Sequence, residues 1–255
     1  MKKVQRVLVP LAAAAVTAVM SPMSAQADSG TNYTATLSPL NNSTGSGMLM
    51  MTLNGDQATI TENWSGLPAS FGGAPYPHVQ HIHIGAQGVC PTASADKNGD
   101  GVVSTTEGAP AYGAIGTTLS TMGDTSPAAG ADLKVAPAGS STNYSRTITL
   151  DSKTLQSVTG GTAVIVVHGL DPATLSKKAQ GEKSDLVPSL PLAATSPSLC
   201  GALSEMPSGG PQTGYGSTAG PEDLGLFGLG GGLLAIAAGA VVWGRKRNVP
   251  AASQS

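Results

Sequence analysis

The stretch "GMLMMTLNGDQATITENWSGL", from Gly47 to Leu67, contains two runs of β-forming residues around the pair Asn54-Gly55. An Asn-Gly pair between two such runs is a strong signal for a β-hairpin, because both residues accept the positive φ that a tight turn requires. The stretch therefore predicts two antiparallel strands joined by a short turn.

Further strand-like runs lie on both sides of this hairpin. They cover residues 32–40, 78–85, 114–120, 143–150 and 162–170. About seven short strands at this spacing are typical of an antiparallel Greek-key sandwich or barrel, so the expected fold class is all-β. One short helix is expected near residues 172–180, with Asp171 as its N-cap and Pro172 at its first position.

The N-terminus has the composition of a secretory signal peptide. Three cationic residues precede an apolar run over residues 7–20, and small residues then lead to Ala27, after which cleavage is expected. An N-terminal membrane anchor is the alternative, but the apolar run is short for one. Residues 1–27 therefore predict export and take no part in the fold.

The C-terminal part has the features of a surface anchor. Residues 204–223 form a flexible linker, and residues 224–243 are uncharged and long enough to cross ~30 Å of hydrocarbon as a transmembrane helix. Basic residues at 245–247 predict that the tail, residues 244–255, stays in the cytoplasm. The folded part is thus expected at the extracellular face of the membrane.

The linker also contains the tetrad Pro211-Gln212-Thr213-Gly214. Together with the apolar span and the basic residues, it resembles a cell-wall sorting signal of Gram-positive, actinobacterial-type bacteria, in which a sortase cuts between Thr and Gly. Gly210 departs from that motif, which has Leu at this position. Attachment is therefore expected either to the membrane or, through a sortase, to the cell wall.

The exported part, residues 28–203, is long enough for one domain. It contains twelve acidic and seven basic residues, a net charge of 7 − 12 = −5. Such a surface repels phosphate backbones, so nucleic acid is not an expected partner.

The exported part also contains the only two cysteines of the chain, Cys90 and Cys200. An oxidising compartment favours their pairing, and two buried free thiols are the weaker alternative. A disulfide that closes so long a loop stabilises a fold by about 4 to 5 kcal/mol in the chain-entropy model.

Three of the four histidines of the chain stand in the segment "HVQHIHIG". Alternation along a strand puts His81 and His83 on one face, about 7 Å apart, whereas His78 has the opposite parity. His168 ends the most apolar strand, where a structural, hydrogen-bonded histidine is as much expected as a ligand. Asp171 fits either a helix cap or a partner for that imidazole. Three imidazoles from two strands would suit copper or zinc.

At these residues the sequence resembles the copper/zinc superoxide dismutases. The segments "HIHIG", "VVHGL" and "LCG" occur in the order found there, and the N-terminal half also resembles the CHRD (chordin-type) domain, which shares the H-I-H-x-G element. The resemblance implies a β-sandwich over most of the exported part. It also implies a copper site at His81, His83 and His168, and a disulfide between Cys90 and Cys200.

Two departures from the dismutases bear on activity. No histidine lies between Ile84 and Val167, so the zinc ligands have no counterpart, and Pro197 stands where the dismutases have an arginine that guides superoxide. The first interpretation is therefore a surface-anchored metal-binding β-sandwich with no catalysis assigned. The alternatives are a copper-only superoxide dismutase, with His78 as a fourth ligand, and a structural or adhesive CHRD-type module.

The segment "DKNGDGVVSTTE" fits the calcium loop of EF-hands at every position. The expected oxygen ligands are Asp96, Asn98, Asp100, Val102 through its carbonyl, Ser104 and Glu107. A convincing pair of flanking helices is not expected, so the segment predicts an isolated loop that binds calcium with a Kd on the order of 0.1 to 1 mM, which stiffens the loop. The alternative is a solvated turn rich in Asp, Asn and Gly.

Overall fold

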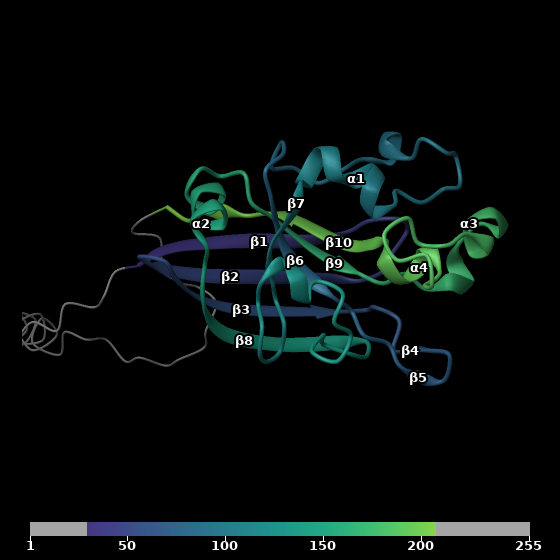
Figure 1. Cartoon of the computed structure of the whole chain (residues 1–255), viewed down its shortest axis with the longest axis horizontal. Helices are drawn as coiled ribbons and strands as arrows, with labels where there is room; N and C mark the ends of the chain where they lie inside the picture. The colour runs from purple at the N-terminus through teal and green to yellow at the C-terminus, as the bar shows by residue number, and fades with distance from the viewer. Residues whose placement is uncertain (1–29, 208–255) are drawn as a thin grey trace, which may run out of the picture. The chain divides into compact units, whose positions relative to one another are not determined.

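The computed structural model describes residues 30–207, which form an antiparallel β structure with short helices at its margins (Figure 1). The predicted signal peptide, sorting tetrad, membrane span and cytoplasmic tail lie outside these residues. Among residues 30–207, no helix has the length and hydropathy needed to cross a membrane.

The strands and helices alternate irregularly along the chain. The strands are β1 (Thr31–Pro39), β2 (Ser46–Asn54), β3 (Gln57–Ser65), β4 (Ser70–Phe71), β5 (Ala74–Pro75), β6 (Gln80–Ile84), β7 (Ala114–Thr118), β8 (Ser141–Thr149), β9 (Val164–His168), β10 (Pro197–Ala202) and β11 (Ser204–Glu205). The α-helices are α1 (Thr105–Tyr112), α2 (Ser152–Thr159), α3 (Lys177–Gly181) and α4 (Leu192–Thr195), and the 3-10 helices are η1 (Ala93–Ala95), η2 (Pro127–Ala129) and η3 (Pro172–Thr174).

The main sheet has the strand order β7-β6-β9-β10-β1-β2-β3-β8, with β11 beside β1. Strand β1 connects its two halves, because residues 31–37 pair with β2 and the last residues, Ser38 and Pro39, pair with β10. One hydrophobic cluster contains Leu49 and Ile60 from one half and Ile165 from the other. The two halves therefore enclose a common core, and the expected antiparallel all-β class is confirmed.

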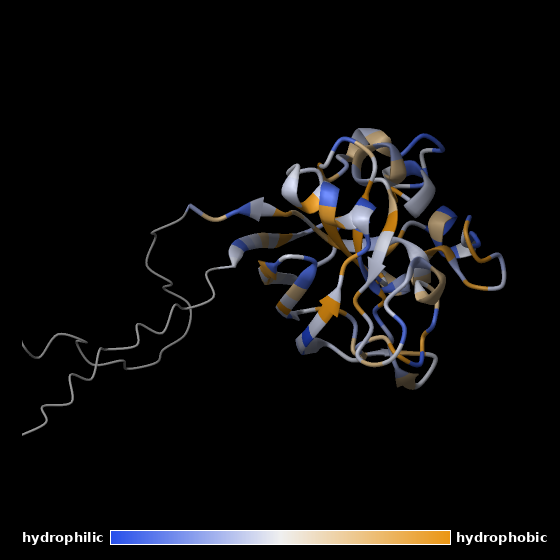
Figure 2. Ribbon diagram, turned by 60° about the vertical axis from the view of Figure 1, so that its left-hand side comes forward, coloured by the Kyte–Doolittle hydropathy of each residue, from blue (hydrophilic) through white to orange (hydrophobic). Residues whose placement is uncertain are grey.

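The hairpin predicted from the sequence is strand β2 followed by β3. Asn54 pairs with Gln57, so Gly55 and Asp56 form the turn, and Gly55 has a φ of +62°. A two-residue hairpin turn needs a positive φ at its first central position, which glycine adopts without strain. Alternate residues of β3 are buried. Figure 2 shows hydrophobic and hydrophilic bands following one another along strands of the domain.

The remaining predicted strands are confirmed within a few residues as β1, β6, β7, β8 and β9, whereas β10, α1 and α2 have no counterpart among the predicted elements. The predicted helix at 172–180 is divided into η3 and α3. Asp171 is the expected N-cap, since its carboxylate accepts a hydrogen bond from the backbone N–H of Ala173.

Candidate metal centre

Strands β6 and β9 are neighbours and carry three histidines on one face. His81 pairs with Val166 across the two strands, and His168 lies two residues beyond Val166. Directly opposed residues of an antiparallel pair share a face, and so do residues two apart, such as His81 and His83. Ile82 has the opposite parity and packs into the core. The three imidazoles therefore lie on the outer face of this half of the sheet.

The three imidazoles converge. One ring nitrogen from each of His81, His83 and His168 lies within 4.8 Å of the other two, and all three side chains are buried. The ring centroids are 5.6 Å apart for His81 and His83, and 5.2 Å apart for His81 and His168. The structure thus brings together the three histidines that the sequence predicts as ligands.

Each imidazole has one nitrogen bonded to a backbone carbonyl. These bonds join Nε2 of His81 to Gly130 at 3.0 Å, Nδ1 of His83 to Gly113 at 2.9 Å, and Nδ1 of His168 to Thr195 at 2.7 Å. A carbonyl oxygen can only accept, so these three nitrogens carry protons and donate. In a neutral imidazole, the opposite nitrogen then has a free lone pair.

These opposite nitrogens are Nδ1 of His81 and Nε2 of His83 and His168, and they have no hydrogen-bond partner among the described residues. Burial lowers the pKa of His83 to about 4 and that of His168 to about 3. Burial, followed by the neighbouring imidazoles, also holds the pKa of His81 well below its usual value. All three rings are therefore neutral at pH 7, the form in which histidine binds metals.

The three carbonyl acceptors belong to segments that cover the outer face of the sheet. Gly130 follows η2, Gly113 ends α1, and Thr195 is the last residue of α4. Gly113 has a φ of +93°, and a Cβ there would lie 1.9 Å from the carbonyl oxygen of Ile84, so this position requires glycine. Sequence patterns do not reveal these acceptors, because every residue has a carbonyl group.

His78 lies apart from the three histidines. Its Nδ1 is 2.9 Å from the carbonyl oxygen of His168 and its Nε2 is 3.0 Å from that of Pro68. Its ring packs edge-on against Trp64, a residue of the core. His78 precedes β6, which begins at Gln80, and its ring also contacts Tyr76 and does not belong to the group of converging imidazoles. The structure therefore does not provide His78 as a fourth ligand.

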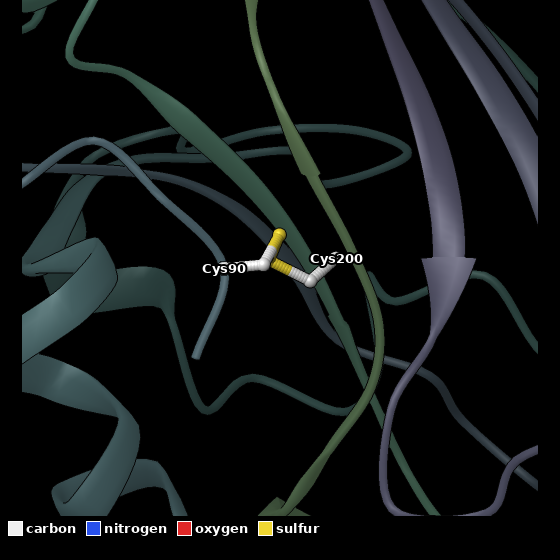
Figure 3. The surroundings of a disulfide bond; sticks show 2 residues. All are labelled: Cys90 and Cys200. Atoms are coloured by element: carbon white, nitrogen blue, oxygen red, sulfur yellow. A yellow bond between two sulfur atoms is a disulfide. The ribbon is translucent and has the colours of Figure 1, made fainter. Parts of the chain in front are cut away.

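Cys90 and Cys200 form the predicted disulfide, with an S–S distance of 1.99 Å and a Cα–Cα distance of 5.8 Å (Figure 3). Cys200 lies on β10 and packs with Val166 of β9 and with Tyr112 of α1. The ring of Tyr112 in turn lies 4.6 Å from that of His83. The disulfide therefore ties the segment between β6 and α1 to the sheet, close to the histidines.

The predicted calcium loop leads directly into α1. Ser104 is the N-cap of this helix and forms a capping box with Glu107, in which each side chain accepts a hydrogen bond from the backbone N–H of the other. The loop therefore leads into an α-helix, which corrects the expectation for the segment after the loop, whereas the element before the loop is the 3-10 helix η1. The reason is that Ser and Glu at this spacing satisfy two backbone donors at the start of a helix.

The side chains of this loop are bonded mainly to its own backbone. Asp96 accepts from Gly99 and Gly101, Asp100 from Val102 and from the Asn98 side chain, and Glu107 from Lys97, Asn98 and Ser104. The pKa of Asp96 is lowered, mainly by the hydrogen bond that its carboxylate accepts from the backbone N–H of Gly101. Within residues 30–207, His81, His83 and His168 form a group of potential metal ligands whose ligand atoms lie within 4.8 Å of one another, and the acidic side chains of this loop do not form such a group.

A cavity of about 510 Å³ opens over the histidines. His81, His83 and His168 are among its lining residues, together with residues of α1, η2 and α4. The imidazole side chains therefore form part of the cavity wall, and their three unpartnered nitrogens lie buried within that wall.

No protein-family model matches the chain, and no curated protein matches it in sequence. Among solved structures, two of superoxide dismutase 5 from Candida albicans, its copper(II) form and a point mutant, are similar to it. The alignments cover 73% of this chain and 99% and 98% of the dismutase chains, with 15% identity and a TM-score of 0.38 in both cases.

Proposed function

We propose that the chain binds one copper ion through Nδ1 of His81 and Nε2 of His83 and His168. The observation that carries this proposal is the group of three buried nitrogens without hydrogen-bond partners. Each buried polar atom left unpaired costs about 1 to 3 kcal/mol, and a single bound cation would satisfy all three. Imidazole suits both copper and zinc, and the Irving–Williams order gives copper the higher affinity.

The surroundings of the three rings also favour a metal. The carbonyls of Gly130, Gly113 and Thr195 hold each ring by its second nitrogen, an arrangement that orients metal-binding histidines and increases their basicity. Because the pKa values of His83 and His168 lie near 4 and 3, protons do not compete with a metal for these nitrogens at neutral pH.

Replacing His168 by alanine is expected to lower the affinity for copper by more than about 100-fold, since loss of even an indirect partner of a metal ligand costs about 10- to 100-fold. The full-length protein should bind one copper ion, measured by calorimetry and by metal analysis after dialysis. His78→Gln also removes an imidazole, but not one of the three ligands, and should retain the metal.

Two results would contradict the copper site: the wild-type protein retains no copper, or His168→Ala retains as much as the wild type. Retention of no metal would favour the structural or adhesive module. Superoxide decay on the same copper-loaded samples tests the dismutase alternative. We expect no large acceleration, because the described lining of the cavity contains no cationic side chain to steer an anion.

We also propose that the domain works outside the cell, attached to the membrane or the cell wall. The disulfide supports this location, because disulfides persist in oxidising compartments. The predicted signal peptide and C-terminal anchor agree with it. Antibody labelling of intact cells that is no stronger than labelling of a cytoplasmic protein would exclude it.

A second proposed site is a calcium ion in the loop from Asp96 to Glu107. Besides the order of its oxygen donors, the loop contains the buried Asp100, whose interaction with the nearby Glu182 carboxyl raises the pKa of Glu182. A divalent cation would relieve the repulsion between these two carboxylates once both are ionised.

Calcium at about 10 mM is expected to raise the Tm of the full-length protein by about 3 °C, if the Kd is about 1 mM. Glu107→Gln should abolish this rise, because glutamine keeps the capping box but removes the negative charge. Thermal scans of both proteins with and without calcium provide the comparison. Equal shifts for both proteins, or no shift for the wild type, would exclude the site.

A further inference from the structure

The cavity over the histidines has a chemistry of its own. Its walls are mainly aliphatic and include Val79, Ile115, Leu133, Leu186, Val187 and Leu190. Apart from the three imidazoles, the polar side chains of the described lining are threonine hydroxyls, and none of its side chains is charged. An anion or a cation would lose its hydration there without gaining a charged partner, whereas an apolar molecule would gain from leaving water.

The opening of the cavity is apolar as well. Leu133 and Leu186 line the cavity while remaining 44% and 55% exposed. They belong to two different covering segments, one after η2 and one before α4. The volume of about 510 Å³ is within the range of sites for small organic molecules and far exceeds the volume of a diatomic ligand.

Among the side chains that line the cavity, the three imidazoles carry the strongest donor atoms. They are buried, without hydrogen-bond partners among the described residues, and belong to side chains that line the cavity. Three imidazoles leave at least one position of a bound copper ion open to a further ligand. A molecule in the cavity therefore has an apolar wall for its body and a metal position for one donor atom.

We propose that this cavity binds a neutral, mostly apolar organic molecule, about the size of one or two rings, which places a single uncharged donor atom on the metal held by His81, His83 and His168. This inference rests on the proposed copper site for the position of the donor atom. Its apolar part depends only on the walls of the cavity and is tested without metal.

The first experiment uses the full-length protein without metal and the neutral fluorescent probe N-phenyl-1-naphthylamine. We expect saturable binding, weakened at least about tenfold by the double variant Leu133→Asp/Leu186→Asp, because each substitution places a charge at the opening. Met122→Asp is the matched control, since Met122 is 64% exposed and does not line the cavity. Absence of saturable binding to the wild type, or equal binding by the double variant and the control, would overturn the apolar-ligand inference.

The second experiment uses the copper-loaded protein and follows the visible and electron paramagnetic resonance spectra of copper(II). 4-Phenylimidazole is expected to bind about 10- to 100-fold more tightly than imidazole, because both offer the same donor atom and only the former has an apolar body. Azide, an anion, is expected to bind more weakly than either. Equal affinities for the two imidazoles, or tightest binding by azide, would overturn the proposed ligand class.

The two experiments separate the two proposals. If copper is not retained but the fluorescent probe binds and the double variant releases it, the copper site fails and the apolar class of ligand stands. If copper is retained but neither apolar probe gains affinity from the cavity, the copper site stands and the ligand class fails.

Discussion

Replacing Glu62 by glutamine is expected to remove the contribution of this one group to the pH dependence of stability between about pH 4.5 and about pH 8. As the pH rises over this range, the group should lower the free energy of unfolding of the wild-type protein by about 4 to 5 kcal/mol. Glu62 lies on β3 between Ile60 and Trp64, two residues of the core, and is only 1% exposed. Neither carboxylate oxygen has a hydrogen-bond partner among the described residues. Burial accordingly raises the pKa of Glu62 from 4.5 to about 8.

The sign of the effect follows from proton binding. Between the unfolded pKa of 4.5 and the folded pKa of about 8, the native state holds a proton that the unfolded state has released. The stability contributed by this group is therefore fully present below the unfolded pKa and is lost as the pH rises through the folded value. Glutamine has nearly the same shape but does not titrate, so the variant should lack this slope and exceed the wild type in stability at alkaline pH.

Urea unfolding of both proteins from about pH 5 to about pH 9 measures how the free energy of unfolding depends on pH. Subtracting the values of the variant from those of the wild type cancels the contribution of groups that titrate equally in both. Glu205→Gln is the control. Glu205 is exposed on β11, so its replacement should change stability by less than about 0.5 kcal/mol. Parallel curves for wild type and Glu62→Gln would show that the native state does not keep Glu62 protonated, contrary to its burial.

Replacing both Cys90 and Cys200 by serine is expected to lower the free energy of unfolding by about 4 to 5 kcal/mol. The disulfide joins residues 110 positions apart, and opening so long a loop restores much conformational freedom to the unfolded chain. The closed loop contains α1, β7, β8 and β9, so it includes His168 and the three carbonyl acceptors, whereas β6 with His81 and His83 precedes it. The double variant avoids the unpaired thiol that a single substitution would leave.

Urea unfolding with and without a reductant provides the control for this prediction. Reduction should destabilise the wild type toward the double variant and leave the double variant unchanged, because only the wild type contains the disulfide. If the wild type has the same midpoint before and after verified reduction, the disulfide contributes little to stability and the folded segments hold the loop by themselves.

The sequence contains signals for two further features of the structure, the buried carboxyl of Glu62 and the start of α1. The segment "TITENW" alternates, and its period places Glu62 on the same face as Ile60 and Trp64, which indicates a buried carboxyl. Similarly, Ser104 and Glu107 have the spacing of a capping box, which indicates the start of α1. A match to a calcium loop explained the same two residues, so the helix has no counterpart among the predicted elements.

The sequence by itself determined the directions of side chains within each strand. Alternation is a local property of the backbone, so it placed His81 and His83 on one face and separated the buried and exposed residues of β3. Composition and chain length likewise indicated one antiparallel domain, and the pairing of the only two cysteines agrees with the structure.

Only the tertiary structure decided what surrounds those side chains. It brought His168 beside the other two histidines through the register of β6 and β9, and it placed the carbonyls of Gly113, Gly130 and Thr195 against the three rings. It also formed the apolar cavity from segments far apart in the chain. The physical reason is that backbone carbonyls are chemically alike at every residue, so long-range packing alone selects which of them bind the imidazoles and leave the opposite nitrogens free.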